Sequence, residues 1–186
     1  MKTLILTVAL GVACLSGFAQ GQLNFANFGA GANQPIFNTD GVTKLGAGFS
    51  ADLYWGPAGT TDSTLLTALG QPASFSGSSG YFFGGTRTIN GQPGGATITG
   101  QVRVWDTADG NSWAAAYAAG LAGSMTAVIG ESVIFNIMLT TPPSTPNSLT
   151  GLNGHPFALD VLIPEPSAVA LLGLGFAGML VLRRRR

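Results

Sequence analysis

The chain has 186 residues, and its eight Lys and Arg formally balance its eight Asp and Glu. Four of the basic residues are the last four of the chain, so residues 20–163 carry three basic against seven acidic residues, a net charge of −4. A weakly acidic surface without a basic patch argues against a nucleic-acid partner. The only cysteine is Cys14, so residues 20–163 can have neither a disulfide nor a thiolate metal site.

The first 19 residues have the three regions of a secretory signal peptide. Lys2 supplies the positive charge, residues 4–12 form the apolar stretch, and small residues predict cleavage after Ala19 or two residues later. Cys14 also fits a lipobox cysteine, but Gly11 stands where such boxes usually have leucine. We therefore expect export by the Sec machinery and removal of residues 1–19 by signal peptidase.

Short apolar segments separated by Gly, Pro and Asn follow, a pattern typical of strands and turns. The expected strands are residues 23–28, 34–38, 49–55, 73–75, 81–83, 86–90, 96–106, 131–139 and 157–163. Segment 64–69 fits either a helical turn or a strand. The pairs Asp40-Gly41 and Asn90-Gly91 predict hairpin turns.

Segment 49–55 alternates most clearly between apolar and polar residues. The inner face is expected to carry Phe49, Ala51, Leu53 and Trp55, and the outer face Ser50, Asp52 and Tyr54. Segment 131–139 is apolar on both faces and is therefore expected to be one central strand. Alanine-rich residues as far as Ala119, capped by Asn111 or Ser112, predict the single short helix.

These elements predict an all-β sandwich of roughly eight to ten strands with one short helix, formed by residues 20–163 as one domain. The pattern leaves a jelly-roll-like and an immunoglobulin-like topology open. Two terminal segments flank this domain, an N-terminal signal peptide and a C-terminal transmembrane helix.

Residues 20–163 contain no recognisable catalytic motif, so we predict no enzymatic activity, no catalytic residue, no metal site and no cofactor. The single histidine, His155, precedes a proline and is expected in an exposed loop.

Weaker binding candidates remain. Tyr54, on the outer face, is a candidate for contact with a sugar ring. Asp106 and Asp109 lie in the sequence DTADGN and could bind calcium together with Asn111. The same two aspartates could form a glycosidase carboxylate pair, or an Asx-rich turn that caps the helix.

The last 23 residues have three parts in a fixed order. Pro164-Glu165-Pro166 comes first, followed by the apolar run 167–182 and the four arginines Arg183, Arg184, Arg185 and Arg186. The 16-residue run would form a helix about 24 Å long, slightly short of the roughly 30 Å hydrocarbon core of a bilayer. The arginines predict a cytoplasmic C-terminus by the positive-inside rule, and the prolines keep the preceding peptide extended.

This arrangement resembles the PEP-CTERM protein-sorting signal of Gram-negative bacteria. The resemblance implies that an exosortase, a membrane-embedded cysteine transpeptidase-like enzyme, recognises Pro164-Glu165-Pro166 and cuts nearby, releasing or transferring the protein. In that chemistry this chain is the substrate. The same motif is sometimes labelled an ice-binding protein C-terminal domain, a label that describes the tail alone.

The segments GQLNFANF, ADLYWGP, QVRVWDTADG and GESVIFNI are similar to parts of small PEP-CTERM proteins that build extracellular matrix. We therefore expect a non-enzymatic cell-surface or matrix protein associated with exopolysaccharide and biofilm. Its tail would be anchored transiently in the inner membrane before the protein reaches the cell surface. The alternatives are a carbohydrate- or calcium-binding adhesion module, a secreted hydrolase, or a permanently membrane-anchored surface protein.

Overall fold

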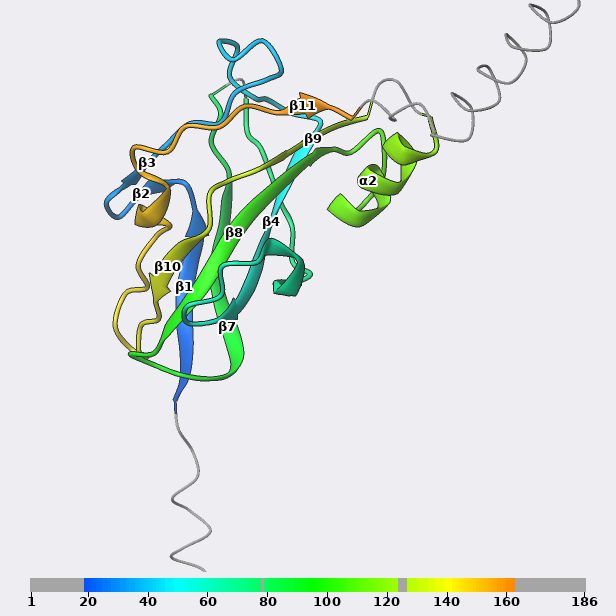
Figure 1. The fold of residues 1–186 in the computed structure, drawn as a ribbon. Helices are drawn as coiled ribbons and strands as arrows, with labels where there is room; N and C mark the ends of the chain where they lie inside the picture. The colour runs from blue at the N-terminus through cyan, green and yellow to red at the C-terminus, as the bar shows by residue number, and fades with distance from the viewer. Residues whose placement is uncertain (1–18, 78, 124–126, 163–186) are drawn as a thin grey trace, which may run out of the picture.

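The computed structural model describes residues 19–77, 79–123 and 127–162, and these form mostly β-strands (Figure 1). The strands are β1 (Gln20–Ala26), β2 (Phe28–Gly29), β3 (Ala32–Asn33), β4 (Phe49–Pro57), β5 (Thr67–Ala68), β6 (Ala73–Ser74), β7 (Phe83–Pro93), β8 (Thr97–Asp106), β9 (Val128–Glu131), β10 (Phe135–Met138) and β11 (Asp160–Val161). The helical segments are α2 (Trp113–Leu121) and the 3-10 helices η2 (Ser63–Leu65) and η3 (Thr150–Leu152). The predicted mostly β fold with one short helix is confirmed.

The antiparallel pair β4–β8 forms the centre of the largest sheet. Phe49 lies opposite Asp106 at one end, and Pro57 lies opposite Ile98 at the other. Strands β9 and β10 pair with the far edge of β8, β5 and β6 pair with the far edge of β4, and β11 pairs with β9. Strands β1 and β7 form a separate two-stranded ribbon, and β2 pairs with β3.

The hydrophobic core lies between the inner face of the large sheet and the β1–β7 ribbon. Its fully buried side chains come from both, and include Leu23, Phe25, Ala51, Leu53, Ile89, Val102 and Val104. Phe49 and Trp55 pack against this core, so the predicted inner face of β4 is confirmed. All the named strand pairs are antiparallel and the sheets are open. The jelly-roll-like and immunoglobulin-like topologies stay predictions.

The single strand expected over 131–139 is wrong, because the chain breaks there into β9 and β10. Glu131 lies opposite Arg103, whereas Phe135 lies opposite Gly100. Between these two pairs the β9–β10 segment therefore has one more residue than β8. Ser132 occupies the break: its N–H donates to the carbonyl of Val102 at 2.9 Å, and its Oγ accepts from the Val102 N–H at 2.9 Å. A side-chain oxygen thus replaces a backbone carbonyl at a β-bulge.

The two predicted hairpin turns have different outcomes. The turn at Asp40-Gly41 is confirmed by the antiparallel bridge between Phe37 and Lys44 and by the positive φ of Gly41, 68°. Asn90-Gly91 instead lies inside β7, where the register shifts between two neighbouring residues of β1. Gly91 supplies a positive φ of 79° to that bulge.

Segment 64–69 contains both of the structures that its pattern allowed. The 3-10 helix η2 ends at Leu65, and the short strand β5 follows at Thr67. The strand expected over 34–38 is reduced to isolated bridges at Phe37, with Lys44 and with Ala158.

Asn27 is a fully buried polar residue that joins three segments. Its amide nitrogen donates to the carbonyls of Gln34 and Gly80 at 2.8 and 2.9 Å, and its Oδ1 accepts from the Phe82 N–H at 2.8 Å. Buried polar groups with every hydrogen bond made hold the surrounding backbone in one arrangement. Asn27 therefore fixes the end of β1 against the segments before β4 and β7.

We expect Asn27→Asp to destabilise the exported chain by about 3 kcal/mol or more, because it places an acceptor against two buried carbonyls. The free energy of unfolding, measured in a denaturant titration followed by tryptophan fluorescence, checks this. The matched control is Asn111→Asp at an exposed position, for which a change within about 0.5 kcal/mol is expected. Equal effects of the two substitutions would contradict the role of Asn27.

Candidate functional site

The outer face of the large sheet carries polar residues in its middle and a helix at one end. Alternation along β8 turns Gln101, Arg103 and Trp105 away from the core that receives Val102 and Val104. At the end where β8 leads into α2, Trp105 packs with Ala116 and Ile129, and Trp113 and Leu162 border this second cluster. The outer face is therefore the place where a partly buried polar site can form.

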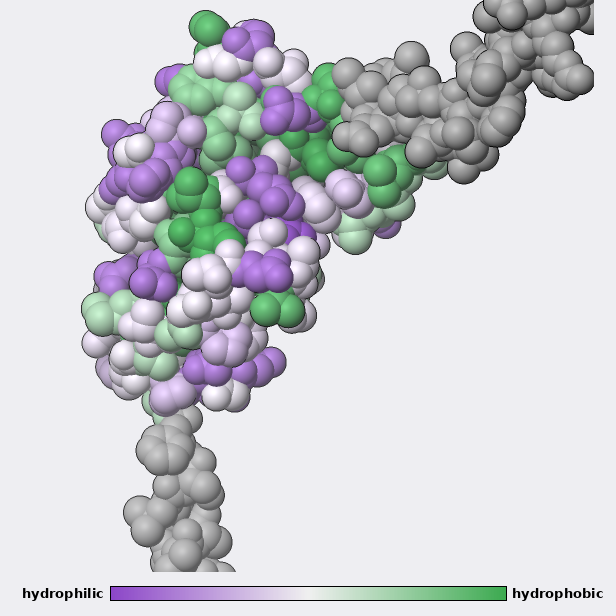
Figure 2. All heavy atoms as spheres, in the orientation of Figure 1, coloured by the Kyte–Doolittle hydropathy of each residue, from purple (hydrophilic) through white to green (hydrophobic). Residues whose placement is uncertain are grey.

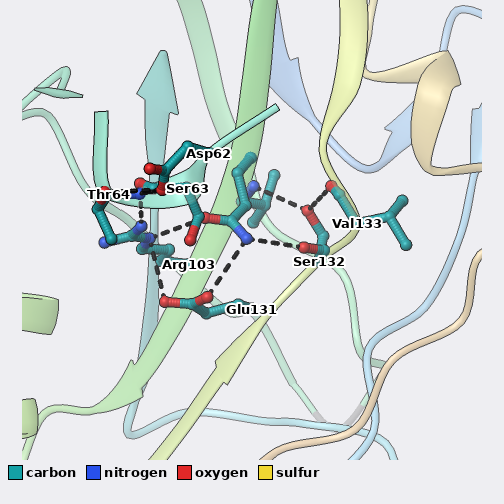
Figure 3. A network of polar contacts seen from close by, with 9 residues as sticks. Asp62, Ser63, Thr64, Arg103, Glu131, Ser132 and Val133 are labelled. Carbon is teal, nitrogen blue, oxygen red and sulfur yellow. Dashed lines mark hydrogen bonds and ion pairs between the residues drawn. The ribbon is translucent and has the colours of Figure 1, made fainter. Parts of the chain in front are cut away.

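Arg103 is the centre of that polar region and is only 7% exposed. Its Nε lies 3.0 Å from Gln101 Oε1 and 3.2 Å from Glu131 Oε1, and its NH2 group donates to the Ser63 carbonyl at 2.8 Å (Figure 3). The carboxylate of Asp62 holds η2 in place by accepting from the N–H and hydroxyl of Thr64. Those hydrogen bonds also lower the pKa of Asp62.

Aromatic rings surround the same guanidinium. The Arg103 Cζ lies 4.1 Å from the centre of the Tyr54 ring and 4.5 Å from that of the Trp113 ring. Tyr117, one helical turn further along α2, stacks on Trp113 with 4.9 Å between ring centres and 13° between planes. The charge of Arg103 is therefore shared among two aromatic faces, one carboxylate and one carbonyl, which makes it a fixed structural cation.

Tyr54, the predicted sugar contact, lies inside this cluster. It is half-buried, and burial raises the pKa of its hydroxyl, while the positive charge of Arg103 opposes that shift. The guanidinium of Arg103 lies over one face of the Tyr54 ring. A role for Tyr54 in ligand contact stays a prediction.

The loop that follows β8 contains the two predicted aspartates. Asp106 Oδ1 accepts from the Ala108 N–H at 2.8 Å, and Asp109 Oδ2 accepts from the Val128 N–H at 3.4 Å. The loop lines a surface hollow of about 370 Å³. Ser112 caps α2 by accepting from the Ala115 N–H at 3.2 Å. Asp106 thus accepts from the backbone of its own turn, as in the turn alternative, whereas Asp109 joins the loop to the first residue of β9.

Within residues 19–77, 79–123 and 127–162, no group of three or more His, Cys, Asp and Glu residues is placed to hold a metal ion. His155 is exposed in a loop, as predicted. Calcium binding by Asp106 and Asp109 stays a prediction.

Asp52 is a buried carboxylate at the opposite edge of the outer face. Its Oδ1 accepts from the Leu53 N–H at 2.9 Å, and its Oδ2 accepts from the Gly70 N–H at 3.0 Å. Gly70 lies between β5 and β6, which both pair with β4. Burial raises the pKa of Asp52, and hydrogen bonds from the backbone oppose that shift. Asp52 therefore bridges the gap between two short edge strands.

The described part of the chain ends where β11 joins the sheet beside α2. Val161 pairs with Val128, and the Leu162 N–H donates to the Ala127 carbonyl at 2.9 Å. The Leu162 side chain packs on Gly120 so closely that a Cβ there would lie 2.5 Å from Leu162 Cδ2. The last described residue is therefore anchored to the helix.

A family model for the PEP-CTERM protein-sorting motif matches residues 162–186. The chain ends in a PEP-CTERM motif. The predicted resemblance of the tail is confirmed, and the motif implies an exported protein that is sorted at the cell surface and processed by an exosortase. No curated protein and no solved structure matches the chain. The PEP-CTERM match begins at Leu162, the residue at which the described fold ends.

Most residues predicted to act in export and sorting lie outside the described residues. They are the signal peptide before Ala19, the motif Pro164, Glu165 and Pro166, the apolar run 167–182, and Arg183, Arg184, Arg185 and Arg186. Ala19 is described and directly precedes β1, where its carbonyl accepts from the Gly94 N–H at 3.0 Å. Cleavage after Ala19 stays a prediction.

Among the helices of the described residues, none has the length and apolar character needed to cross a membrane.

The Arg103 cluster was not foreseen from the sequence. The available signal was one arginine between two valines in an alternating segment, which indicates a charge on the outer face of a strand. Its partners Glu131 and Ser63 come from segments far along the chain, and Trp113 comes from the helix that follows β8, so local pattern does not bring them together.

We expect Arg103→Lys to destabilise the exported chain by about 1–3 kcal/mol, because lysine keeps the charge but loses the planar fork and its stacking. Denaturant unfolding measures the change. Arg87→Lys is the matched control, since Arg87 makes a single long hydrogen bond, 3.4 Å to the Gln71 carbonyl. A loss for Arg103→Lys no greater than that for Arg87→Lys would contradict the central role of Arg103.

The raised pKa of Asp52 predicts that the stability of the folded chain decreases as the pH rises. Its pKa is raised above the usual 3.8 in the folded state, so the folded state binds this proton more tightly than the unfolded state does. Its stabilising contribution is present below the usual pKa and is lost as the pH rises through the raised value. The wild type should therefore lose stability relative to Asp52→Asn over that window, measured by unfolding at a series of pH values.

Asp40 provides a control of opposite sign. Hydrogen bonds from Thr43 and then Val42 lower the pKa of Asp40, so its contribution is present above the usual pKa and is lost as the pH falls. The wild type should therefore lose stability relative to Asp40→Asn as the pH decreases. The same sign for both variants would show that the Asp52 carboxyl is not shifted by burial.

Proposed function

We propose that this chain is a non-enzymatic surface or extracellular-matrix protein that an exosortase cuts at or near Pro164-Glu165-Pro166. The observation that carries the proposal is the PEP-CTERM motif over residues 162–186. Residues 1–19 act as the signal for export through the Sec machinery, and signal peptidase removes them. Before sorting, the apolar run 167–182 spans the inner membrane of a Gram-negative bacterium, and Arg183–Arg186 remain in the cytoplasm.

The described fold supports a non-enzymatic role. Arg103, on the outer face of the sheet, already pairs with Gln101, Glu131 and the Ser63 carbonyl. The carboxylates of Asp106 and Asp109 accept hydrogen bonds from nearby backbone N–H groups. Catalysis by general acids and bases depends on groups free to exchange protons with a substrate, and these groups instead hold the fold together.

A matrix location is consistent with the surface of the domain. Residues 20–163 are weakly charged, with three basic and seven acidic residues. Because the segment contains no cysteine, its stability rests on noncovalent interactions and not on disulfides. We expect the released domain to act in a biofilm, in association with exopolysaccharide.

Intact-mass analysis of the protein from its native host tests processing directly. We expect a chain that begins near Gln20, ends near Pro164-Glu165-Pro166 and lacks the four arginines. Replacing these three tail residues by alanine should leave the complete tail on the protein, because exosortase would no longer recognise it. A wild-type chain that still ends at Arg186 would reject processing and indicate a permanent membrane anchor.

A further inference from the structure

Helix α2 is apolar on all sides but is buried on only one. Its sequence, WAAAYAAGL, contains no charged residue, and its buried residues are Ala116 and Gly120. The outer face is exposed and consists of Ala114, Ala115, Tyr117, Ala118 and Leu121. Tyr117 is 37% exposed and Leu121 is 56% exposed. A helix that is hydrophobic all round is normally covered on every side, by protein or by lipid.

The position of this helix relative to the tail limits what can cover it. Leu162 packs on Gly120, so the described chain ends beside the C-terminal turn of α2, to which β11 leads (Figure 1). Five residues further on, at Ser167, the apolar run begins. Five extended residues reach at most about 18 Å. When the tail is in the membrane, α2 is therefore held close to the membrane surface.

We propose that the outer face of α2 lies on the outer surface of the membrane that holds the tail, as long as the tail is uncut. This inference rests on the proposed function, because it requires residues 167–182 to be inserted. Tyr117 is suited to the headgroup region, where tyrosine is enriched, and Leu121 can reach the edge of the acyl chains. The surface over α2 is mainly pale green in Figure 2.

The lack of charge on α2 determines what kind of lipid contact is expected. No lysine or arginine of the helix can pair with anionic headgroups, so the attraction comes from apolar burial and from the tether. A single turn of contact from Tyr117 to Leu121 is too small for tight binding without that tether. The contact should therefore require the tail, be independent of anionic lipid, and end when the tail is cut.

Such a contact would serve the sorting reaction. With α2 on the membrane, Leu162 is held at the surface, and Pro164-Glu165-Pro166 follows within two residues. The segment to be cut then lies at the depth where a membrane-embedded enzyme can reach it. Cutting removes the tether, and the domain leaves the membrane.

Site-specific labelling can test the contact in the full chain. The only native cysteine is removed as Cys14→Ala, and one cysteine at a time is introduced as Ala118→Cys, Ala58→Cys or Ala177→Cys. Ala118 lies on the outer face of α2, whereas Ala58 is exposed beside Pro57, at the opposite end of β4. Ala177 lies in the apolar run. Each chain is labelled with a polarity-sensitive fluorophore and reconstituted into vesicles of zwitterionic lipid, with or without anionic lipid.

We expect the fluorophores at positions 118 and 177 to emit severalfold more strongly and at shorter wavelength than the fluorophore at position 58. A quencher attached to lipid chains should reduce the emission at 118 and 177 only. A chain ending at Pro166 should lose the signal at 118. These results should be the same in both kinds of vesicle.

The other outcomes separate the two proposals. A fluorophore at 177 that stays in water would overturn membrane insertion, and the α2 contact with it. Shielding at 177 together with a water-exposed fluorophore at 118 would overturn the α2 contact alone. Shielding at 118 that rises with protein concentration and resists the lipid quencher would overturn it in favour of a second copy of the chain.

A second pair of variants tests whether the emission shift at position 118 depends on the apolar outer face of α2. Leu121→Glu should remove most of the emission shift at 118, because it places a charge on the face that meets lipid. Leu65→Glu is the matched control at a 68% exposed leucine of η2, and should leave the shift unchanged. Circular dichroism establishes that both variants are folded. An unchanged shift in a folded Leu121→Glu chain would overturn the proposal.

Discussion

The pairing of β4 with β8 is the interaction on which the rest of this structure depends. Nine consecutive residue pairs join the two strands from Phe49–Asp106 to Pro57–Ile98, and every other strand of the large sheet attaches to their edges or to β9. Because side chains alternate, this one ladder creates both faces of the sheet. One face closes the core against the β1–β7 ribbon, and the other presents Tyr54 and Arg103 to α2. A slip of one residue would exchange the two faces.

The parts of the fold that the sequence predicted are those with a strong local period. Alternation over 49–55 and 96–106 identified β4 and β8 as strands, and the alanine-rich segment identified α2, because these signals depend on neighbours in the chain. The central position was expected for segment 131–139 and belongs instead to the β4–β8 pair. The break at Ser132 and the Asn90-Gly91 bulge were missed because each depends on the strand opposite. Asn27 and Arg103 were missed for the same reason. Gly80, a partner of Asn27, and Glu131, a partner of Arg103, each lie more than 25 residues away along the chain. The sorting motif was recognised because all its parts are contiguous.

The polar side chains of the outer face show how a protein with few charges and no disulfide can keep one arrangement. Asp52 bridges two edge strands, Arg103 joins η2 to β9, and Ser132 completes the break between β9 and β10. Asp52 and Ser132 are satisfied by backbone atoms, whereas Arg103 has mostly side-chain partners. A buried group left without its partner would be costly.

The sorting signal and the folded domain meet at Leu162. This residue donates a backbone hydrogen bond to Ala127 beside the sheet, packs on Gly120 in α2, and is the first residue of the PEP-CTERM match. The tail and the domain are therefore not joined by a long linker that would let each act alone. A short connection means that inserting the tail also fixes which end of the domain approaches the membrane. That end carries the uncharged helix α2, whereas β1 begins at the far end of the sheet (Figure 1). The exposed apolar residues of α2 are thus explained by the proposed insertion of the tail, which brings this end of the domain to the membrane.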